Sequence, residues 1–408
     1  MRAPILFIFT CLTELTAQNS PTFSDSLRLC ATPTEFEKEL RLSHPELAEG
    51  LASPMISSLF AWSEVLGGGK FGEVRAMGSG SSSIAIKRIP LVSETIRELS
   101  MKEIRILKMI CGMTNFISLR EPFVCEEEFT AAFLGCVEAE EETESSFYLF
   151  MTRLSGDFSQ KEVQIVYGNL PADKKVILFL NVIDIFERLS RKGIVHHDIR
   201  LENLMQFGVN FEDPRLVDFG MAKFLTQSSQ ASNKEAEKVR KENKNQLPEA
   251  KSKGNLKAGA RKSDSPLPEF AFSDDVYAIA FRLAELEALQ SPRTRRALQN
   301  LDPNCLFDLE SDPCHEKIAL KIPLIFGPSN PLHFLFHPFR KALSPEKSHR
   351  FASALEFSHA ILDALFSDQK ASFHTGKLLL EASDSKLWRP YALQKLNQLS
   401  EKLQIEDL

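Results

Sequence analysis

The sequence predicts an α+β protein built in two parts, a small β-rich part followed by a larger helical part. Three observations predict this. Short β-like runs alternate with Gly and Ser from Trp62 onward, a helical stretch follows at about 95–110, and beyond about residue 155 the chain reads mostly as helix. No internal repeat is visible.

The β-rich part is predicted from short apolar runs separated by turn residues. The Gly- and Ser-rich segment 78–83 is a candidate hairpin turn between two of these runs. A stretch rich in Glu, at 126–144, lies between the last two. The predicted strands are 63–66, 74–77, 84–89, 117–124 and 147–151.

Two helices are predicted from the spacing of their apolar residues. In 95–110, Ile96, Leu99, Ile104 and Leu107 recur near helical spacing. A longer helix at 173–191 has its apolar residues on one face, and it ends at Lys192-Gly193, as a helix C-terminus commonly does.

Composition limits the function classes that fit. The 408 residues are 43% hydrophobic and 25% charged, which is typical of a folded chain, and the net charge of −6 argues against direct nucleic-acid binding by the whole protein. No apolar run reaches the roughly 18 residues of a membrane-spanning helix, so no membrane partner is expected. The short apolar run after Arg2 resembles a signal peptide, but Glu14 interrupts it. We interpret it as an N-terminal segment that packs on the protein.

The cysteines predict a reducing compartment. There are seven, with irregular spacing and no Cys-x-x-Cys pair, so neither a disulfide framework nor a zinc site is indicated. We therefore expect an intracellular protein, cytoplasmic or nuclear.

A glycine-rich turn is the first candidate for a phosphate-binding element. Leu66-Gly67-Gly68-Gly69-Lys70-Phe71-Gly72-Glu73-Val74 places glycines where backbone N–H groups can approach phosphate oxygens. A dinucleotide-binding motif needs a helix directly after the glycines, and here a strand is predicted. A P-loop needs Ser or Thr after Gly-Lys, and here Phe71 follows. A plain glycine-rich hairpin is the alternative.

Lys87 ends the apolar run Ala85-Ile86-Lys87 and would need anionic partners if it points inward. Nucleotide phosphates and a carboxylate would supply them, and Glu103 is the best placed carboxylate in the predicted helix. The alternative is a lysine whose stem lies on the strand while its ammonium reaches water.

Two later motifs carry the chemistry of phosphoryl transfer. His196-His197-Asp198 leads to Asn203, and Asp218-Phe219-Gly220 follows about twenty residues after Asp198. Asp198 can accept the proton of an attacking hydroxyl. Asn203 and Asp218 can hold the Mg²⁺ that bridges the phosphates.

These motifs, in this order, resemble those of eukaryotic-type protein kinases over residues 60–366. Further matches are Phe147–Met151 before a hinge, Leu267-Pro268-Glu269, the run that starts at Asp275, and Arg350 as a partner of Glu269. The resemblance implies a bilobal kinase-like fold, with a small antiparallel β-rich N-lobe containing one main helix and a larger helical C-lobe. The implied organisation is an extension (1–58), a kinase domain (59–366; N-lobe 59–151, C-lobe 155–366) and a C-terminal tail (367–408).

The resemblance also implies ATP and Mg²⁺ as cofactors and assigns the site residues. Asp198, Arg200, Lys87 and Glu103 would be catalytic, and Asn203 and Asp218 would bind metal. The residues that would contact ATP are Leu66, Gly67, Gly68, Gly69, Lys70, Phe71, Gly72, Glu73, Val74, Ala85, Lys87, Met151, Thr152 and Leu154.

The chain departs from the family pattern at three positions. His197 stands where the family usually has Arg, Arg200 where serine/threonine kinases usually have Lys, and Lys262 where a Thr is usual. A Lys-rich insertion at 226–262 lengthens the activation segment. Such an insertion resembles the cell-division-control kinases, which would place the protein in the cell cycle.

Two functions stay open from the sequence. The first is an active kinase with protein substrates, for which Arg200-Leu201-Glu202-Asn203 favours Ser/Thr over Tyr; an activating subunit is compatible with it. The second is a pseudokinase that binds nucleotide or partners without chemistry, which His197 and Lys262 favour.

Overall fold

The computed structural model describes most of the chain and has the two parts that the sequence predicts. It describes residues 30–43, 60–61, 63–69, 72–77, 84–111, 130, 133–140, 145–208, 211, 213–225, 268–300, 312–367, 369–382 and 385–403. Several predicted features lie outside these residues. They are Lys70, Phe71, the turn 78–83, the strand 117–124, the insertion 226–262 with Lys262, and the side chain of Glu269.

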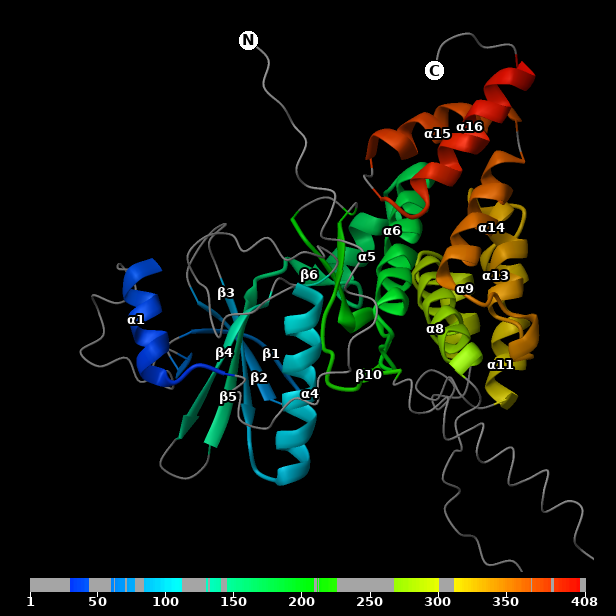
Figure 1. Cartoon of the computed structure of the whole chain (residues 1–408). Coiled ribbons are helices and arrows are strands. Elements are labelled where there is room, and N and C mark those ends of the chain that lie inside the picture. The colour runs from blue at the N-terminus through cyan, green and yellow to red at the C-terminus, as the bar shows by residue number, and fades with distance from the viewer. Residues whose placement is uncertain are drawn as a thin grey trace, which may run out of the picture.

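The N-terminal part is a five-stranded antiparallel sheet with one main helix, as predicted (Figure 1). The strand order is β1-β2-β3-β5-β4. The helix α4 (Glu94–Cys111) buries Ile104, Leu107 and Ile110 on one face, and it packs against β4. The strands are β1 (Glu64–Gly69), β2 (Gly72–Met77), β3 (Ile84–Pro90), β4 (Phe133–Glu140) and β5 (Ser145–Thr152).

The edge strand β4 was not predicted, and the cysteine prediction was wrong. β4 begins at Phe133, in the stretch assigned only as Glu-rich, and it pairs with β5 along its length. Its Cys136 forms a disulfide with Cys30, which precedes helix α1 (Pro33–Ser43). Cys111 and Cys314 are also in disulfides. The spacing of the cysteines in the sequence did not indicate these disulfides, because cysteine pairing depends on which residues the fold brings together.

The disulfide anchors part of the predicted N-terminal extension to the sheet. Ala31 bridges Val137 in parallel, with Ala31 N donating to Cys136 O at 2.9 Å and Glu138 N donating to Ala31 O at 3.1 Å. Helix α1 contacts β4 beside this bridge (Figure 1). The short segment therefore acts as an added strand on an edge that would otherwise expose unpaired backbone groups.

The C-terminal part is helical, and its buried apolar residues form one continuous core with those of α4 and the inner face of the sheet. The predicted helix 173–191 is observed as α6 (Ala172–Arg191), which packs against α8 and α14 (Figure 1). The other helices are α5 (Lys161–Gly168), α8 (Pro268–Ala288), α9 (Pro292–Gln299), α11 (Asp312–Ala319), α12 (Ile322–Ile325), α13 (Phe336–Ala342) and α14 (Ala354–Phe366), with 3-10 turns η2 (Leu201–Asn203), η3 (His333–Leu335) and η4 (Lys347–His349).

Short strands connect and position the loops that lie between the two parts. They form a three-stranded sheet, in the order β6-β8-β9, and the β10-β7 pair. The strands are β6 (Gly156–Asp157), β7 (Ile194–Val195), β8 (Leu204–Gln206), β9 (Pro214–Leu216) and β10 (Lys223–Phe224). They fix the segment from 194 to 225, which contains both candidate catalytic motifs.

Two further helices, within the segment assigned as a tail, pack on the helical part. Helices α15 (Gln369–Ala382) and α16 (Arg389–Leu403) both contact α14, and α15 also contacts α6 (Figure 1). Trp388 is 1% exposed, and Ser385 Oγ donates to the buried Asp184 at 2.8 Å. Among the described residues, no helix is both long and apolar enough to cross a membrane.

Candidate active site

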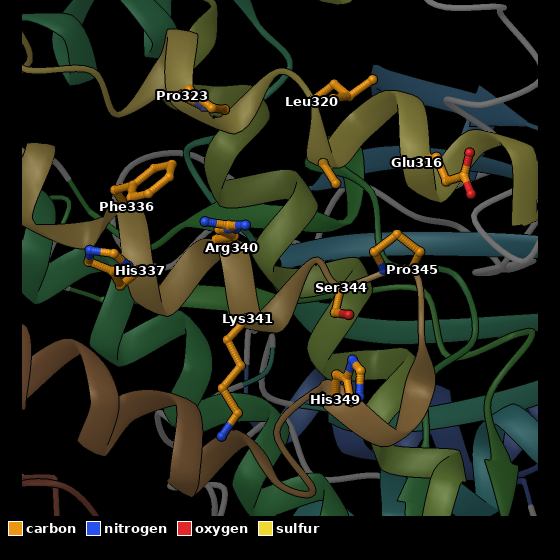
Figure 2. A pocket seen from close by; sticks show the side chains of 11 residues that line it. Glu316, Leu320, Pro323, Phe336, His337, Arg340, Lys341, Ser344, Pro345 and His349 are labelled. Atoms are coloured by element: carbon orange, nitrogen blue, oxygen red, sulfur yellow. The ribbon is translucent and has the colours of Figure 1, made fainter.

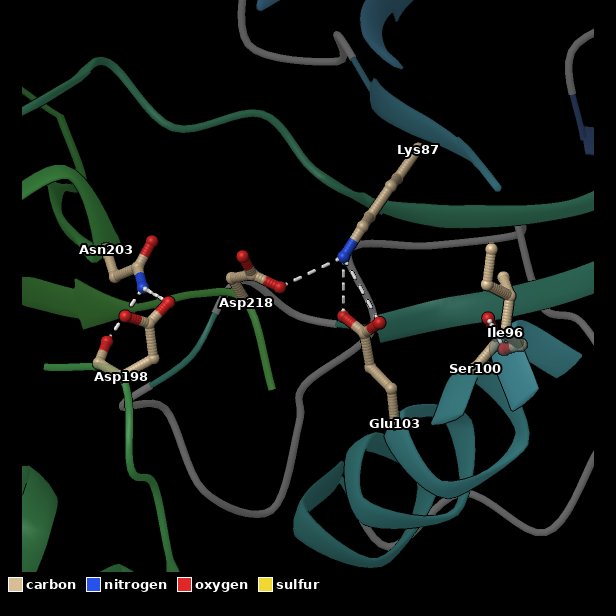
Figure 3. Close-up of polar contacts among 7 residues, drawn as sticks. All are labelled: Lys87, Ile96, Ser100, Glu103, Asp198, Asn203 and Asp218. Carbon is tan, nitrogen blue, oxygen red and sulfur yellow. Dashed lines mark hydrogen bonds and ion pairs between the residues drawn. The ribbon is translucent and has the colours of Figure 1, made fainter. Parts of the chain in front are cut away.

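Lys87 is the centre of the site on the N-terminal part. It lies on β3 opposite Val74 of β2 and Leu149 of β5, so its stem is enclosed by apolar strands. Its Nζ donates to Glu103 at 2.8 and 3.1 Å and to Asp218 Oδ1 at 3.1 Å (Figure 3). The structure therefore joins β3, α4 and the segment after β9 through one ammonium group.

Electrostatics keep this cluster charged. Burial alone would lower the pKa of Lys87, but the negative charges of Glu103 and Asp218 outweigh it and raise that pKa well above its ordinary value. Burial would raise the pKa of Asp218, but Lys87 outweighs it and holds that pKa below its ordinary value. At neutral pH the ammonium and the Asp218 carboxylate therefore both carry full charge.

A second cluster surrounds Asp198. Asn203 Nδ2 donates to the Asp198 backbone carbonyl at 2.8 Å and to its Oδ2 at 3.0 Å (Figure 3). Arg200 Nε lies 3.2 Å from Asp198 Oδ1, an ion pair by distance without hydrogen-bond geometry. One carboxylate is thus held between an amide and a guanidinium. Asp198 and Asn203 are linked to the Lys87 cluster by the backbone bond from Val217 N to Asn203 O, at 2.9 Å.

The loop that carries Asp198 is fixed from below by α8. Asp275 Oδ2 accepts the His196 backbone N–H at 3.3 Å, and Arg282 Nε donates to the Ile199 carbonyl at 2.9 Å. Both side chains are buried, with 7% and 6% exposure. Burial raises the pKa of Asp275 to about 7, although the N–H groups of His196 and His197 partly offset it.

Sequence reasoning did not assign these two positioning residues. Asp275 was noted only as a family landmark at a helix start, and the structure places it inside α8. Arg282 was not noted at all. Its signal was a charged residue within the apolar run Ala278–Leu283, which is unusual unless the charge has a buried partner.

His196 is a buried packing residue beside the loop. Its ring lies 5.1 Å from that of Phe219 and 6.4 Å from that of Phe186, and its Nδ1 accepts the Asp198 N–H at 3.3 Å. Burial lowers the pKa of His196 to about 4, so the ring is neutral at physiological pH. This contact with Phe219 ties the two motifs together.

Two residues of the motifs have left-handed backbone. His197 has φ 61° and Asp218 has φ 63°. Such values are uncommon for residues other than glycine, and they tend to persist where the surrounding structure fixes them, often at active sites. His197, which replaces the usual Arg, is exposed.

The glycine-rich hairpin joins β1 and β2. Gly72 has φ 143°, and a Cβ there would lie 1.9 Å from the Arg88 carbonyl oxygen, so no other residue fits without moving β3. A Cβ on Gly67 would meet no atom within 4 Å, which leaves its backbone accessible. Leu66 lies at a bulge in the β1–β2 pairing and is 40% exposed, and Glu73 pairs with Arg75 at 2.8 Å.

The predicted adenine-contacting residues lie along β3 and β5. Ala85 is the cross-strand partner of Met151, and it is buried, with 8% exposure. Thr152 ends β5, and Leu154 follows at 9% exposure. Val74 stands opposite Lys87 on the neighbouring strand. Val74, Ala85 and Met151 therefore lie on the same face of the sheet as Lys87, and Thr152 and Leu154 lie at and just after the end of β5.

Arg350 was predicted to pair with Glu269, whose side chain lies outside the described residues. In the structure Arg350 Nη1 pairs with Asp274 at 3.1 Å, and its Nε donates to the Ser344 carbonyl at 2.8 Å. It also stacks over Tyr277 at 4.3 Å. Arg350 therefore ties α8 to the turn before α14 through another carboxylate.

The residues present fit a magnesium ion that arrives with a nucleotide. Asp218 offers a carboxylate, and Asn203, whose amide nitrogen is committed to Asp198, offers Oδ1. No group of three or more His, Cys, Asp or Glu among the described residues could hold a metal. Mg²⁺ is commonly held by one or two protein ligands with phosphates and water, so two oxygen ligands suffice.

The fold and these contacts define the class. A small antiparallel sheet with one helix, followed by a larger helical part, is the bilobal α+β fold of protein kinases, as predicted. A lysine on β3 paired with a glutamate of the N-lobe helix is an arrangement that active kinases require. The fold and these contacts are therefore those expected of a protein kinase domain.

Comparisons with known proteins agree with that class. Residues 60–241, a little under half of the chain, match the family model of the protein kinase domain. The serine/threonine-protein kinase dkf-1 of Caenorhabditis elegans is 27% identical over 95 residues, which is 23% of this chain and 13% of the relative. The protein of the same name from Caenorhabditis briggsae is 27% identical over 95 residues, 12% of its length. The matches thus span about an eighth of these relatives.

Proposed function

We propose that the chain is an active protein kinase that transfers the γ-phosphoryl group of ATP to Ser or Thr hydroxyls of protein substrates. The observation that carries the proposal is the Lys87 ammonium, 2.8 Å from Glu103 and 3.1 Å from Asp218. This contact aligns a phosphate-binding cation of the N-lobe with a metal-binding carboxylate of the C-lobe. The limits 59–366 for the kinase domain, with its lobes, stay part of this proposal.

The residues divide the work by position. Lys87, held by Glu103, orients phosphate oxygens, and the hairpin of Gly67, Gly68 and Gly72 offers backbone N–H groups to them. Asn203 and Asp218 would hold Mg²⁺, which neutralises charge on the phosphates when it is bound. Ala85, Met151, Thr152 and Leu154 would contact adenine.

Asp198 is the proposed base. Its carboxylate is oriented by Asn203 and accompanied by Arg200 at 3.2 Å, so it can accept the proton of the substrate hydroxyl while Arg200 offsets developing negative charge. Phosphoryl transfer needs little further covalent help, since positioning and charge neutralisation supply most of the acceleration.

The test is the Asp198→Ala chain with radiolabelled ATP and general acceptor proteins. We expect transfer to fall by at least about 10²-fold, because the base is removed, while nucleotide binding measured by calorimetry stays close to that of the parent. Asp363→Ala, at an exposed position on α14 that contributes nothing to the site, is the matched control and should retain activity. Unchanged turnover of purified Asp198→Ala would contradict the proposal.

A pseudokinase is the second candidate, and His197 is the observation that favours it. A histidine lacks the forked donors with which arginine grips a phosphate, so activation by loop phosphorylation is not supported here. The five residues of the chemistry are nevertheless all present: Lys87, Glu103, Asp198, Asn203 and Asp218. Nucleotide binding without any transfer by the parent chain would favour this candidate.

Partners and compartment are proposals as well. Protein substrates follow from the kinase domain. The sequence alone supports three further proposals: an activating subunit, no nucleic-acid or membrane partner, and a cell-division-control role. Ser/Thr specificity is supported by Arg200-Leu201-Glu202-Asn203 and by the name of the matched relatives. An intracellular location, cytoplasmic or nuclear, fits the kinase class, and the Cys30–Cys136 disulfide weighs against it because such bonds persist in oxidising compartments.

A further inference from the structure

A groove on the helical part lies outside the candidate active site. It has a volume of about 910 Å³ and is lined by residues of α11, α12, α13 and the turn that follows α13, none of which belongs to the catalytic clusters. Figure 2 shows Arg340 between Phe336 and Ser344, facing the side of the groove formed by Leu320 and Pro323. We call this the α11–α13 groove.

The surrounding segment is basic within an acidic chain. Residues 313–350 contain six Lys or Arg and four of the nine His, but only two Glu and no Asp, whereas the whole chain has a net charge of −6. Such a local excess of one sign attracts ligands of the opposite sign and speeds their encounter.

Two cations of the groove are not neutralised within the described part of the chain. Lys347 and Arg350 pair with Asp274, and His349 lies 3.2 Å from Glu346. Arg340 and Lys341 are exposed, and no described carboxylate lies within ion-pair distance of either. Arg340 lies 6.0 Å from the ring of Phe336 and Lys341 4.2 Å from that of Phe351, contacts that leave the charges accessible.

The groove also has an apolar side. Leu320 is 74% exposed, the highest fraction among the exposed large hydrophobic residues of the described chain, and Pro323 and Phe336 line the groove beside it. An exposed apolar surface that includes an aromatic residue beside an accessible arginine fits a protein-binding site, because aromatic residues and Arg are enriched at interfaces. A nucleic acid would be favoured by a continuous run of cations, which this groove, with Glu316 and an apolar side, does not provide.

We propose that the α11–α13 groove is a docking site for an acidic segment of protein substrates, in which an apolar side chain contacts Leu320 and flanking carboxylates meet Arg340 and Lys341. The proposal rests on the proposed kinase function. The charge complementarity, rather than groove size, selects an acidic peptide over other occupants. Docking there holds a substrate by a segment remote from its phosphorylated hydroxyl.

The first experiment measures binding without catalysis. The full chain carrying Asp198→Ala is titrated into a fluorescein-labelled peptide in which Glu residues flank a Leu-Phe pair, and fluorescence anisotropy is recorded. We expect Arg340→Glu with Lys341→Glu to weaken binding by at least about tenfold, since two charge pairs become repulsive. Leu320→Gln should also weaken it. The matched control, Arg293→Glu with Arg296→Glu on α9, makes the same change in net charge and should bind as the parent does.

The second experiment separates docking from the chemistry. A substrate that carries the acidic segment is compared with the same substrate lacking it. The Arg340→Glu, Lys341→Glu chain should show a higher KM for the first substrate only, with unchanged kcat. Loss of all transfer by the parent, with intact peptide binding, would remove the proposed function while leaving the docking site in place.

Three outcomes would overturn the docking proposal. The first is binding that is equal in the parent and both groove variants. The second is displacement of the peptide by RNA at a similar concentration, which would make the groove a nucleic-acid site. The third is tighter binding of a peptide copying residues 138–145, the chain's own Glu-rich segment, which would make a second copy the occupant.

Discussion

The active-site cluster and the α11–α13 groove use the same kinds of side chain in opposite ways. Lys87 is 9% exposed and contacts two carboxylates, whereas Arg340 and Lys341 are exposed and contact aromatic rings. A buried charge needs its partners, so the fold fixes its position. An exposed charge is hydrated and stays available to a ligand. The difference separates groups suited to the proposed chemistry from groups suited to the proposed recognition.

The largest expected effect breaks the buried cluster. Lys87→Met leaves Glu103 and Asp218 facing each other without a cation, so we expect the free energy of unfolding to fall by about 3 kcal/mol and phosphoryl transfer to be lost. Denaturant titration and the radiolabelled-ATP assay measure the two effects.

The pH dependence gives a check on the same variant. Lys87 holds the pKa of Asp218 below its ordinary value, so the stability from this pair is present above the ordinary pKa and is lost as the pH falls. The difference between parent and Lys87→Met should therefore shrink on acidification. Lys87→Arg keeps the charge and should lie between the two in stability. A Lys87→Met chain as stable as the parent at neutral pH would show that the pair contributes nothing.

An intermediate effect is expected at Asp275, a buried carboxylate with no cation among its contacts in the described part of the chain. Its pKa is raised from 3.8 to about 7, so its stability contribution is full below the lower value and is lost as the pH rises through the higher one. Asp275→Asn removes the titration and keeps an acceptor for the His196 N–H. From about pH 5 to about pH 8 the variant should gain up to about 3 kcal/mol relative to the parent.

Asp275→Asn also has a defined control. Asp274→Asn, at the preceding residue, removes a half-buried carboxylate that pairs with Lys347 and Arg350. It should not reproduce the relative gain at high pH, because it removes two ion pairs rather than a carboxylate buried without a cation among its described contacts. Parallel pH profiles for Asp275→Asn and the parent would mean that the Asp275 pKa is close to its ordinary value in the folded protein.

The smallest effect is expected for the exposed cations of the α11–α13 groove. Arg340→Glu with Lys341→Glu should change the free energy of unfolding by no more than about 0.5 kcal/mol, because neither charge has a described ion-pair partner. Thermal and denaturant unfolding check this directly. A loss of several kcal/mol would mean that these cations stabilise the fold. The docking proposal would then be tested by the binding of the Leu320→Gln variant alone.

Local sequence patterns were sufficient to predict the two-part fold and most strands of its β-rich part, and they singled out the candidate site residues. Apolar spacing is local, so it predicted helices close to α4 and α6. Lys87 and Glu103 could be paired because a buried ammonium demands a carboxylate and few were available at the right place in the helix. The order of the Asp198 and Asp218 motifs was sufficient to predict that they share one site.

The features that depend on contacts between distant segments could be seen only in the folded protein. β4, the Cys30–Cys136 disulfide, the Asp274–Arg350 pair and the α11–α13 groove each join residues whose sequence signals are weak when taken alone. Asp275 and Arg282 support the loop that carries Asp198 from a helix about eighty residues later in the chain. Local patterns report which face of an element is apolar, whereas the partner of each polar or sulfur group is chosen by packing in three dimensions.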